Sequence, residues 1–242
     1  MENAVEKLFE GTYEYFQSGQ NYSQENFTVS RNDETRDFIF ASEMMSRVES
    51  GEFFKMKVHL LLNQFHAPQV LIIEKSLGDK NTQEAFEVDA KAQILKCTFK
   101  STEGTHVVER PFSTTKHYLA TPCFVTAGLF TLTKKIDTTA RNVVHFVTPK
   151  TSWDFSGPPE DKLMWVDLKT HDTEDLEVGG MPLTASKFEL HDEDASAGNA
   201  NSSAQLWVSK HFGIPYQLEE KSGAKIVIRR LKKLKHNMEK MF

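Results

Sequence analysis

The segment from Ser203 to Leu234 reads SAQLWVSKHFGIPYQLEEKSGAKIVIRRLKKL and decides the fold class. Three runs in it alternate apolar and polar residues, at 204–209, 214–219 and 225–230. That alternation is typical of strands with one buried face. The turns between them contain Gly213-Ile214-Pro215 and Ser222-Gly223, residue types that favour tight reversals. The segment therefore predicts a three-stranded meander, in which Trp207 is buried.

The remainder of the chain repeats this pattern. Alternating segments recur about every ten residues, separated by polar or glycine-containing turns. We expect one all-β domain over residues 1–242, built as a large curved antiparallel sheet of roughly ten or more strands with a half-barrel-like shape. Residues 1–9 are the exception at the N-terminus, because Val5, Leu8 and Phe9 share one face of a short helix.

The alternation breaks between Arg110 and Asp137. Pro122 precedes the apolar segment CFVTAGLFTLTK, and proline suits the first position of a helix. We therefore predict a helix near residues 122–134, lying on the concave face of the sheet. Further on, residues 149–161 predict a long polar loop with Trp153 and Phe155 exposed.

Composition narrows the range of functions. The chain has 242 residues, 39% of them hydrophobic, and a net charge of −5, which argues against general nucleic-acid binding. An apolar run long enough to span a bilayer is not found, and neither is a signal peptide. We therefore expect a cytoplasmic protein, or a periplasmic one if a leader has been removed. Cys97 and Cys123 are expected to be free buried thiols rather than a disulfide.

A family resemblance rests on the order of motifs in the last third of the chain. Its parts are Trp165, Glu177-Val178-Gly179-Gly180, Lys187-Phe188-Glu189-Leu190, Leu206-Trp207-Val208-Ser209 and Phe212-Gly213-Ile214-Pro215. This order resembles the bacterial β half-barrels of the LolA-like and VioE-like superfamily and their uncharacterised relatives. The resemblance implies a curved antiparallel sheet whose concave face is plugged by a helix and often holds an apolar ligand.

Catalytic signatures are sparse. The histidines do not stand in a zinc-binding pattern, and glycine-rich phosphate loops and nucleophile elbows are absent, so we expect neither a metal nor a cofactor. Cys123 and His117 can be interpreted as a nucleophile and its base. The alternative, a buried thiol near the start of the predicted helix, is favoured because no orienting Asn or Asp is identified.

The sequence therefore favours a binding protein, most simply one that holds an apolar or amphipathic small molecule or lipid against the concave face. Two alternatives stay open: an enzyme on the same scaffold, as in VioE-like proteins, and a structural or protein-interaction module. The candidate ligand-binding residues are Phe38, Phe40, Phe53, Phe54, His117, Phe124 and Phe130.

The C-terminus carries a second candidate surface. Residues 225–242 contain seven basic residues and one acidic residue, with apolar residues at roughly helical spacing among them. Residues 232–242 are interpreted as a basic amphipathic tail that contacts a membrane surface or a protein. The alternative is a last strand that ends in a solvated tail.

Overall fold

The protein is described from a computed structural model, which defines residues 5–48, 50–133, 135–137, 141–168, 174–178, 181–192 and 203–234. Sixteen strands form one sheet. Its order is β8-β7-β6-β5-β4-β3-β2-β1-β16-β15-β14-β13-β11-β10-β9, and β12 pairs with β13 beside this path. All strand pairs are antiparallel except β9 with β10. The predicted all-β class and large curved antiparallel sheet are confirmed.

The strands have the following bounds. The first half comprises β1 (Val5–Gln17), β2 (Gln20–Asn32), β3 (Phe38–Arg47), β4 (Phe53–Leu62), β5 (Pro68–Leu77), β6 (Lys80–Asp89), β7 (Ile94–Ser101) and β8 (Gly104–Pro111). The second half comprises β9 (His117–Leu119), β10 (Asn142–Thr148), β11 (Glu160–Leu168), β12 (Glu174–Val178), β13 (Met181–Asp192), β14 (Ser203–Ser209), β15 (Pro215–Glu220) and β16 (Ala224–Lys233).

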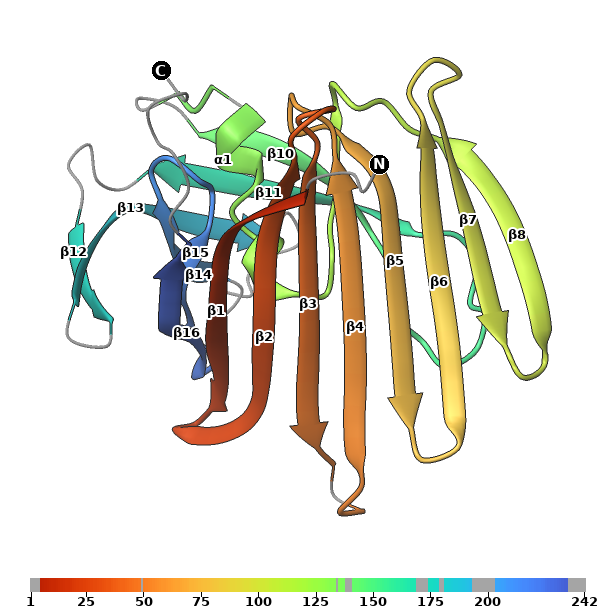
Figure 1. The fold of residues 1–242 in the computed structure, drawn as a ribbon, viewed down its shortest axis with the longest axis horizontal. Helices are drawn as coiled ribbons and strands as arrows, with labels where there is room; N and C mark the ends of the chain where they lie inside the picture. The colour runs from red at the N-terminus through yellow and green to blue at the C-terminus, as the bar shows by residue number, and fades with distance from the viewer. Residues whose placement is uncertain are drawn as a thin grey trace.

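The two halves of the sheet meet at β1 and β16, which pair along most of their length. Strands β1 to β8 stand side by side as one broad wall, and β10, β11 and β13 cross behind it (Figure 1). Alternation along each strand of the wall sends one set of side chains inward, as in β4, where Met56, Val58, Leu60 and Leu62 are buried. The core therefore lies between the wall and the second half of the sheet.

The prediction of a short helix over residues 1–9 is wrong for residues 5–9, the part of this segment that the structure describes. Strand β1 begins at Val5, and Phe9, Gly11, Tyr13 and Tyr15 alternate into the core. Both edges of β1 are occupied, by β2 and β16. Residues 5–7 pair with β2, and from Phe9 onward β1 pairs with both neighbours, and a weak local helical pattern does not outweigh these backbone hydrogen bonds.

The segment that interrupts the meander lies inside the sheet, and we call residues 112–133 the plug. It contains a 3-10 turn, η1 (Phe124–Thr126), and one turn of helix, α1 (Phe130–Thr133), rather than one helix over residues 122–134. Gly128 separates the two turns where the chain passes the β14–β15 turn, and a Cβ on Gly128 would stand 2.3 Å from the carbonyl oxygen of Gly213. A regular helix with a side chain here does not fit that approach.

The loop after β10 packs on the wall instead of standing in solvent. Trp153 and Phe155 are half-buried, which corrects the expectation that they are exposed. The Phe155 ring stacks on His106 with 4.6 Å between ring centroids, and Trp153 meets Phe54 edge-on at 6.0 Å. Polar residues dominate the composition of this loop, but its two aromatic rings pack on the wall. The sequence alone does not show that this part of the wall lies beside the loop.

The segment that decided the fold class folds as predicted. Strands β14, β15 and β16 form the meander, and Trp207 is only 5% exposed. The indole Nε1 donates a hydrogen bond of 2.7 Å to Glu174 on β12, and the Lys187 ammonium lies over the ring. The backbone N–H of Ser209 donates to the Ile214 carbonyl at 2.8 Å, which closes the tight turn before Pro215.

Candidate functional site: a cavity between the plug and the sheet

A cavity of about 300 Å³ lies where the plug meets both halves of the sheet. Its walls are mostly aliphatic and aromatic. It is lined by Leu60, Leu62, His66, Pro68, Tyr118, Leu119, Ala120, Thr121, Thr126, Ala127, Leu129, Phe130, Phe146, Thr148, Lys162, Met164, Leu190 and Leu218. The volume is at the lower end of the range of small-molecule sites, roughly 300–1,000 Å³.

Each wall comes from a different part of the chain. The end of β4 supplies Leu60 and Leu62, and the plug supplies Leu129 and Phe130. Strands β10, β11, β13 and β15 close the opposite side. Phe130 is fixed in place by edge-on contacts with Phe146 and Phe188, whose ring centroids lie 6.2 and 5.9 Å away. The site thus exists only when wall, plug and second half of the sheet are assembled.

A buried carboxylate holds the plug against the wall. Glu25 on β2 is fully buried and accepts hydrogen bonds from the backbone N–H groups of Phe124 at 2.8 Å and Val125 at 3.3 Å. The Tyr15 hydroxyl donates to the same carboxylate. The Phe124 and Val125 N–H groups are the first of the 3-10 turn, and no backbone carbonyl within the turn can accept from them. Glu25 on β2 therefore caps the turn.

Burial dominates the protonation of this cluster. It raises the pKa of Glu25 above its usual value, although the hydrogen bonds from Tyr15 and Phe124 oppose the shift. Burial, and then the Glu25 charge, raise the pKa values of Tyr13 and Tyr15 well above the usual value. The Tyr13 hydroxyl donates to the Pro215 carbonyl at 2.8 Å, so it ties β1 to the β14–β15 turn.

The proposed nucleophile and base are not assembled. Cys123 and Cys97 are both free and buried, which confirms the expectation of free thiols. Burial raises the pKa of Cys123 to about 12, and its sulfur contacts the Thr121 hydroxyl at 2.9 Å. His117 instead accepts a hydrogen bond on Nδ1 from the Ser113 backbone N–H. A thiol that stays protonated and lacks a base is a poor nucleophile.

The candidate ligand-binding residues are scattered along the sheet. Phe130 lines the cavity, and Phe38 stacks on His66 at its edge with 4.8 Å between ring centroids. Phe40 and Phe124 are core residues, and Phe124 packs edge-on against Tyr13. His117 packs against Phe112. A ligand role for any of them stays a prediction, and the geometry places only Phe130 on the cavity wall.

Phe53 and Phe54 lie at the opposite end of β4. A strand rises about 3.3 Å per residue, so they are roughly 20–30 Å along β4 from the two leucines of the cavity. Phe53 is 55% exposed, whereas Phe54 packs against Trp153. The number of aromatic residues in a strand does not indicate which of them lie near the cavity, because the cavity contacts only one end of the strand.

Most of the lining could not be found from the sequence. Tyr118 and Thr121 of the plug, Phe146, Met164 and Leu218 come from four segments whose proximity depends on strand order. Glu25 did carry a signal, because it has the same strand parity as the buried residues Phe27 and Val29. A charged residue at an inward position of a strand marks a buried polar contact.

Two further charged residues at inward strand positions form an ion pair elsewhere on the inner face. Lys75 and Glu84 are joined by a 2.9 Å contact, with side chains only 2% and 9% exposed. The Lys75 ammonium also donates to the Ser152 carbonyl at 2.5 Å. Ser152 belongs to the loop over residues 149–159. At the far end of this loop, Arg110 donates hydrogen bonds to the Pro159 carbonyl and to Asp161. Both ends of the loop over residues 149–159 are therefore tied to the inner face.

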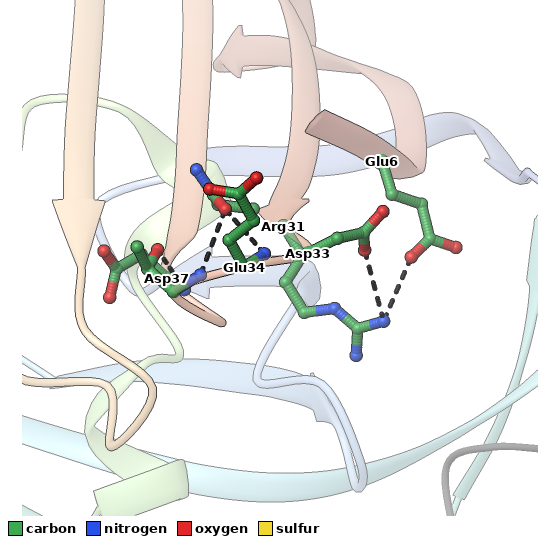
Figure 2. Close-up of polar contacts among 7 residues, drawn as sticks. Glu6, Arg31, Asp33, Glu34 and Asp37 are labelled. Carbon is green, nitrogen blue, oxygen red and sulfur yellow. Dashed lines mark hydrogen bonds and ion pairs between the residues drawn. The ribbon is translucent and has the colours of Figure 1, made fainter. Parts of the chain in front are cut away.

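The acidic side chains near the end of β2 take part in local ion pairs and turn hydrogen bonds. Arg31 lies between Glu6 on β1, at 3.0 Å, and Asp33, at 4.0 Å (Figure 2). The Asn32 side chain accepts hydrogen bonds from the backbone N–H groups of Glu34 and Thr35. In the part of the chain that the structure describes, no group of three or more His, Cys, Asp or Glu side chains could hold a metal ion.

The basic C-terminal region begins inside the sheet. Lys232 and Lys233 belong to β16, and Arg229 and Lys232 pair with Glu14 and Glu10 on β1. Residues 235–242 of the proposed amphipathic tail lie outside the described residues. Within the described ranges, no helix has the length and apolar character needed to cross a bilayer.

Comparison with known proteins identifies the fold. No protein-family model matches the sequence, and neither does any curated protein. The structure is similar to a β-barrel-like protein from Brucella abortus that belongs to DUF1849, a domain of unknown function. The TM-score is 0.58 at 6% identity, over 96% of this chain and 100% of that one. A DUF1089 family protein from Pseudomonas aeruginosa gives 0.49 at 10% identity, over 81% and 88%.

At these identities the likeness to the Brucella protein shows a β-barrel-like fold. The likeness extends over nearly the whole of both chains.

Proposed function

We propose that this protein binds an apolar or amphipathic small molecule in the cavity between the plug and the sheet. The observation that carries the proposal is a mostly apolar space of about 300 Å³ that the plug leaves unfilled. Filling such a space with apolar atoms is favourable, by about 25 cal/mol for each Å² of apolar surface that leaves water. A ligand could gain several kcal/mol from a few hundred Å².

The proposed kinship with LolA-like and VioE-like half-barrels supports the same function. A curved sheet with a short helical segment on its concave face is the arrangement that the resemblance implies, and an apolar ligand is often found there. The enzymatic alternative has less support, because the one thiol near the cavity is protonated and the neighbouring histidine does not face it.

Ligand binding can be tested on the purified full-length protein. Native mass spectrometry followed by organic extraction would identify a co-purified molecule. Titration with Nile red, an uncharged dye that fluoresces in apolar surroundings, would give the affinity and the number of sites. We expect saturable binding at one site.

Two cavity-filling variants locate that site. Ala120→Phe and Ala127→Phe add a ring where both side chains line the cavity, so each should weaken Nile red binding at least tenfold. Ala41→Phe is the matched control, because Ala41 faces outward on β3 between the buried residues Phe40 and Ser42. Thermal unfolding checks that all three variants fold. Equal binding by all of them, or no saturable binding by the parent, would contradict the proposal.

A further inference from the structure

The wall ends at β8, whose outer edge is open to solvent. Among the strands that the structure describes, β7 is its only partner, and β8 is the last strand of the wall (Figure 1). The strand at the other end of the sheet, β9, has only three residues. Proteins commonly block a long open edge with proline, lysine or a bulge, because such an edge can pair with another strand. Residues 104–110 contain neither proline nor lysine, and their register with β7 runs without a shift.

The backbone groups that face this edge belong to Thr105, Val107 and Glu109. The Phe112 N–H donates to the Gln93 carbonyl at 2.8 Å, so this pair is a hydrogen-bonded one. Hydrogen-bonded pairs alternate along an antiparallel ladder, and the even-numbered residues of β8 therefore bond to β7. The N–H and C=O groups of the odd-numbered residues point away from β7. Thr105, Val107 and Glu109 are all exposed, so another chain can reach these groups.

A second copy of β8 fits this edge when the two strands run antiparallel with Val107 on a two-fold axis. The residues whose backbone groups face the edge then lie opposite each other, and about six backbone hydrogen bonds can form. Val107 is opposite itself, and Thr105 of each copy is opposite Glu109 of the other. The Thr105 hydroxyl can therefore donate a hydrogen bond to the Glu109 carboxylate of the second copy.

The charges on the outer face agree with this register. Lys96 on β7 lies opposite Glu109 but pairs with Glu87, at 3.5 Å, so within the described residues the Glu109 carboxylate has no ion pair. Lys100 on β7 lies opposite Thr105. Across the axis, the Lys100 ammonium is two strand spacings, about 10 Å, from the backbone of Glu109 of the second copy, and the two long side chains can span that distance. The two-fold axis makes this contact twice.

Registers shifted by two residues fit less well. In one direction, Val107 lies opposite the Glu109 carboxylate, and Thr105 lies opposite Pro111, which has no N–H to donate. In the other direction, Glu109 lies opposite Glu103, so two carboxylates face each other. Like charges directly opposite each other destabilise an antiparallel pair. The sequence of β8 is therefore complementary to itself in the register centred on Val107.

We infer that two copies of this protein pair through β8, antiparallel and centred on Val107, so that the wall continues from one molecule into the other. The residues that line the cavity do not belong to β8, so the inference is independent of the proposed ligand. A pair of edge strands buries less surface than the roughly 1,600 Å² of a standard interface, and we expect a weak, reversible dimer.

Sedimentation equilibrium of the full-length protein, from about 1 µM to about 1 mM, tests the inference. We expect a monomer–dimer equilibrium in the parent. Val107→Pro removes an N–H that faces the edge and spares the ladder with β7, so it should weaken the dimer at least tenfold. Val107→Thr keeps the N–H and the branched side chain and is the matched control. A parent that stays monomeric throughout, or equal dimerisation by the two variants, would overturn the inference.

Charge variants test the register and leave the backbone unchanged. Glu109→Lys brings like charges together near Lys100 of the second copy and should weaken the dimer at least fivefold. The double variant Thr105→Glu/Glu109→Lys places opposite charges across the axis again and should recover the dimer. Glu87→Lys makes the same change in net charge on β6, two strands from the edge, and is the matched control. Equal weakening by Glu109→Lys and Glu87→Lys, or no recovery in the double variant, would overturn the inference.

Cross-linking tests the position of the axis. Val107→Cys places two thiols opposite each other, with about 5.5 Å between their Cα atoms, which a disulfide can bridge. Lys96→Cys is the matched control, because Lys96 is 48% exposed and Val107 53%, but its two copies would lie about 14 Å or more apart. Cys97 and Cys123 are buried. Under mild oxidation, Val107→Cys should form a covalent dimer at least tenfold faster. Equal rates for the two variants would overturn the inference.

Discussion

The Glu25 carboxylate accepts a hydrogen bond of 2.8 Å from the backbone N–H of Phe124, a residue 99 positions further along the chain. This contact joins the wall to the plug, and the plug forms one side of the cavity. The position of the candidate site therefore depends on a buried acidic side chain as well as on apolar packing.

The first prediction concerns the pH dependence of stability. Burial raises the pKa of Glu25 in the folded state above the ordinary value of 4.5. The folded protein thus holds this proton more tightly than the unfolded chain. Its contribution to the free energy of unfolding is complete below about pH 4.5 and is lost as the pH rises through the folded-state value.

The Glu25→Gln variant lacks this titration. We expect the free energy of unfolding of the parent, relative to the variant, to fall between about pH 4.5 and neutral pH. Urea unfolding of both proteins across that range measures the difference. A difference that stays constant or grows with pH would show that Glu25 is not held with a raised pKa.

The second prediction concerns the buried ion pair. Lys75→Met leaves the Glu84 carboxylate buried without its partner, which should cost about 3–5 kcal/mol in the free energy of unfolding. The double variant Lys75→Met/Glu84→Leu removes both charges and should recover much of that loss. Denaturant unfolding of the three variants supplies the double-mutant cycle.

The pair Lys96–Glu87 is the matched control for this cycle. It also joins neighbouring strands, but its side chains are 48% and 60% exposed. Lys96→Met should therefore cost less than about 1 kcal/mol. Similar losses for Lys75→Met and Lys96→Met would contradict the burial of the Lys75–Glu84 pair.

The third prediction concerns Trp207. Replacing this buried indole by alanine leaves a cavity and should cost about 3–5 kcal/mol. Trp207→Phe keeps a ring but loses the Nε1 hydrogen bond to Glu174, so it should cost less. Chemical denaturation followed by circular dichroism compares the two. A Trp207→Ala protein as stable as the parent would refute the assignment of Trp207 to a packed site.

The fourth prediction concerns the two thiols. Burial raises the pKa of Cys97 to about 11 and that of Cys123 to about 12. Both should therefore resist a thiol reagent such as dithionitrobenzoate at pH 8 in the folded protein and react fully in urea. Reaction of one thiol in the native protein would reveal a local opening, and Cys97→Ser or Cys123→Ser would show which residue it is.

The sequence by itself determined the fold class, because the alternation of apolar and polar residues is a local property of each strand. The meander over residues 203–234 and the burial of Trp207 followed from that pattern and from the Gly213–Pro215 turn. The alternation along β2 and β5 also indicates that the Glu25 and Lys75 side chains point inward.

Only the tertiary structure decided where the cavity lies. Strand order places β1 beside β16 and brings Leu60, Phe130 and Leu218 together, and these contacts join residues far apart in the sequence. Residues 5–9 became a strand because they extend the pairing of β1 with β2, and the plug became two short turns because Gly128 meets Gly213. Local propensity cannot encode such contacts, since they arise from backbone hydrogen bonding and packing between distant segments.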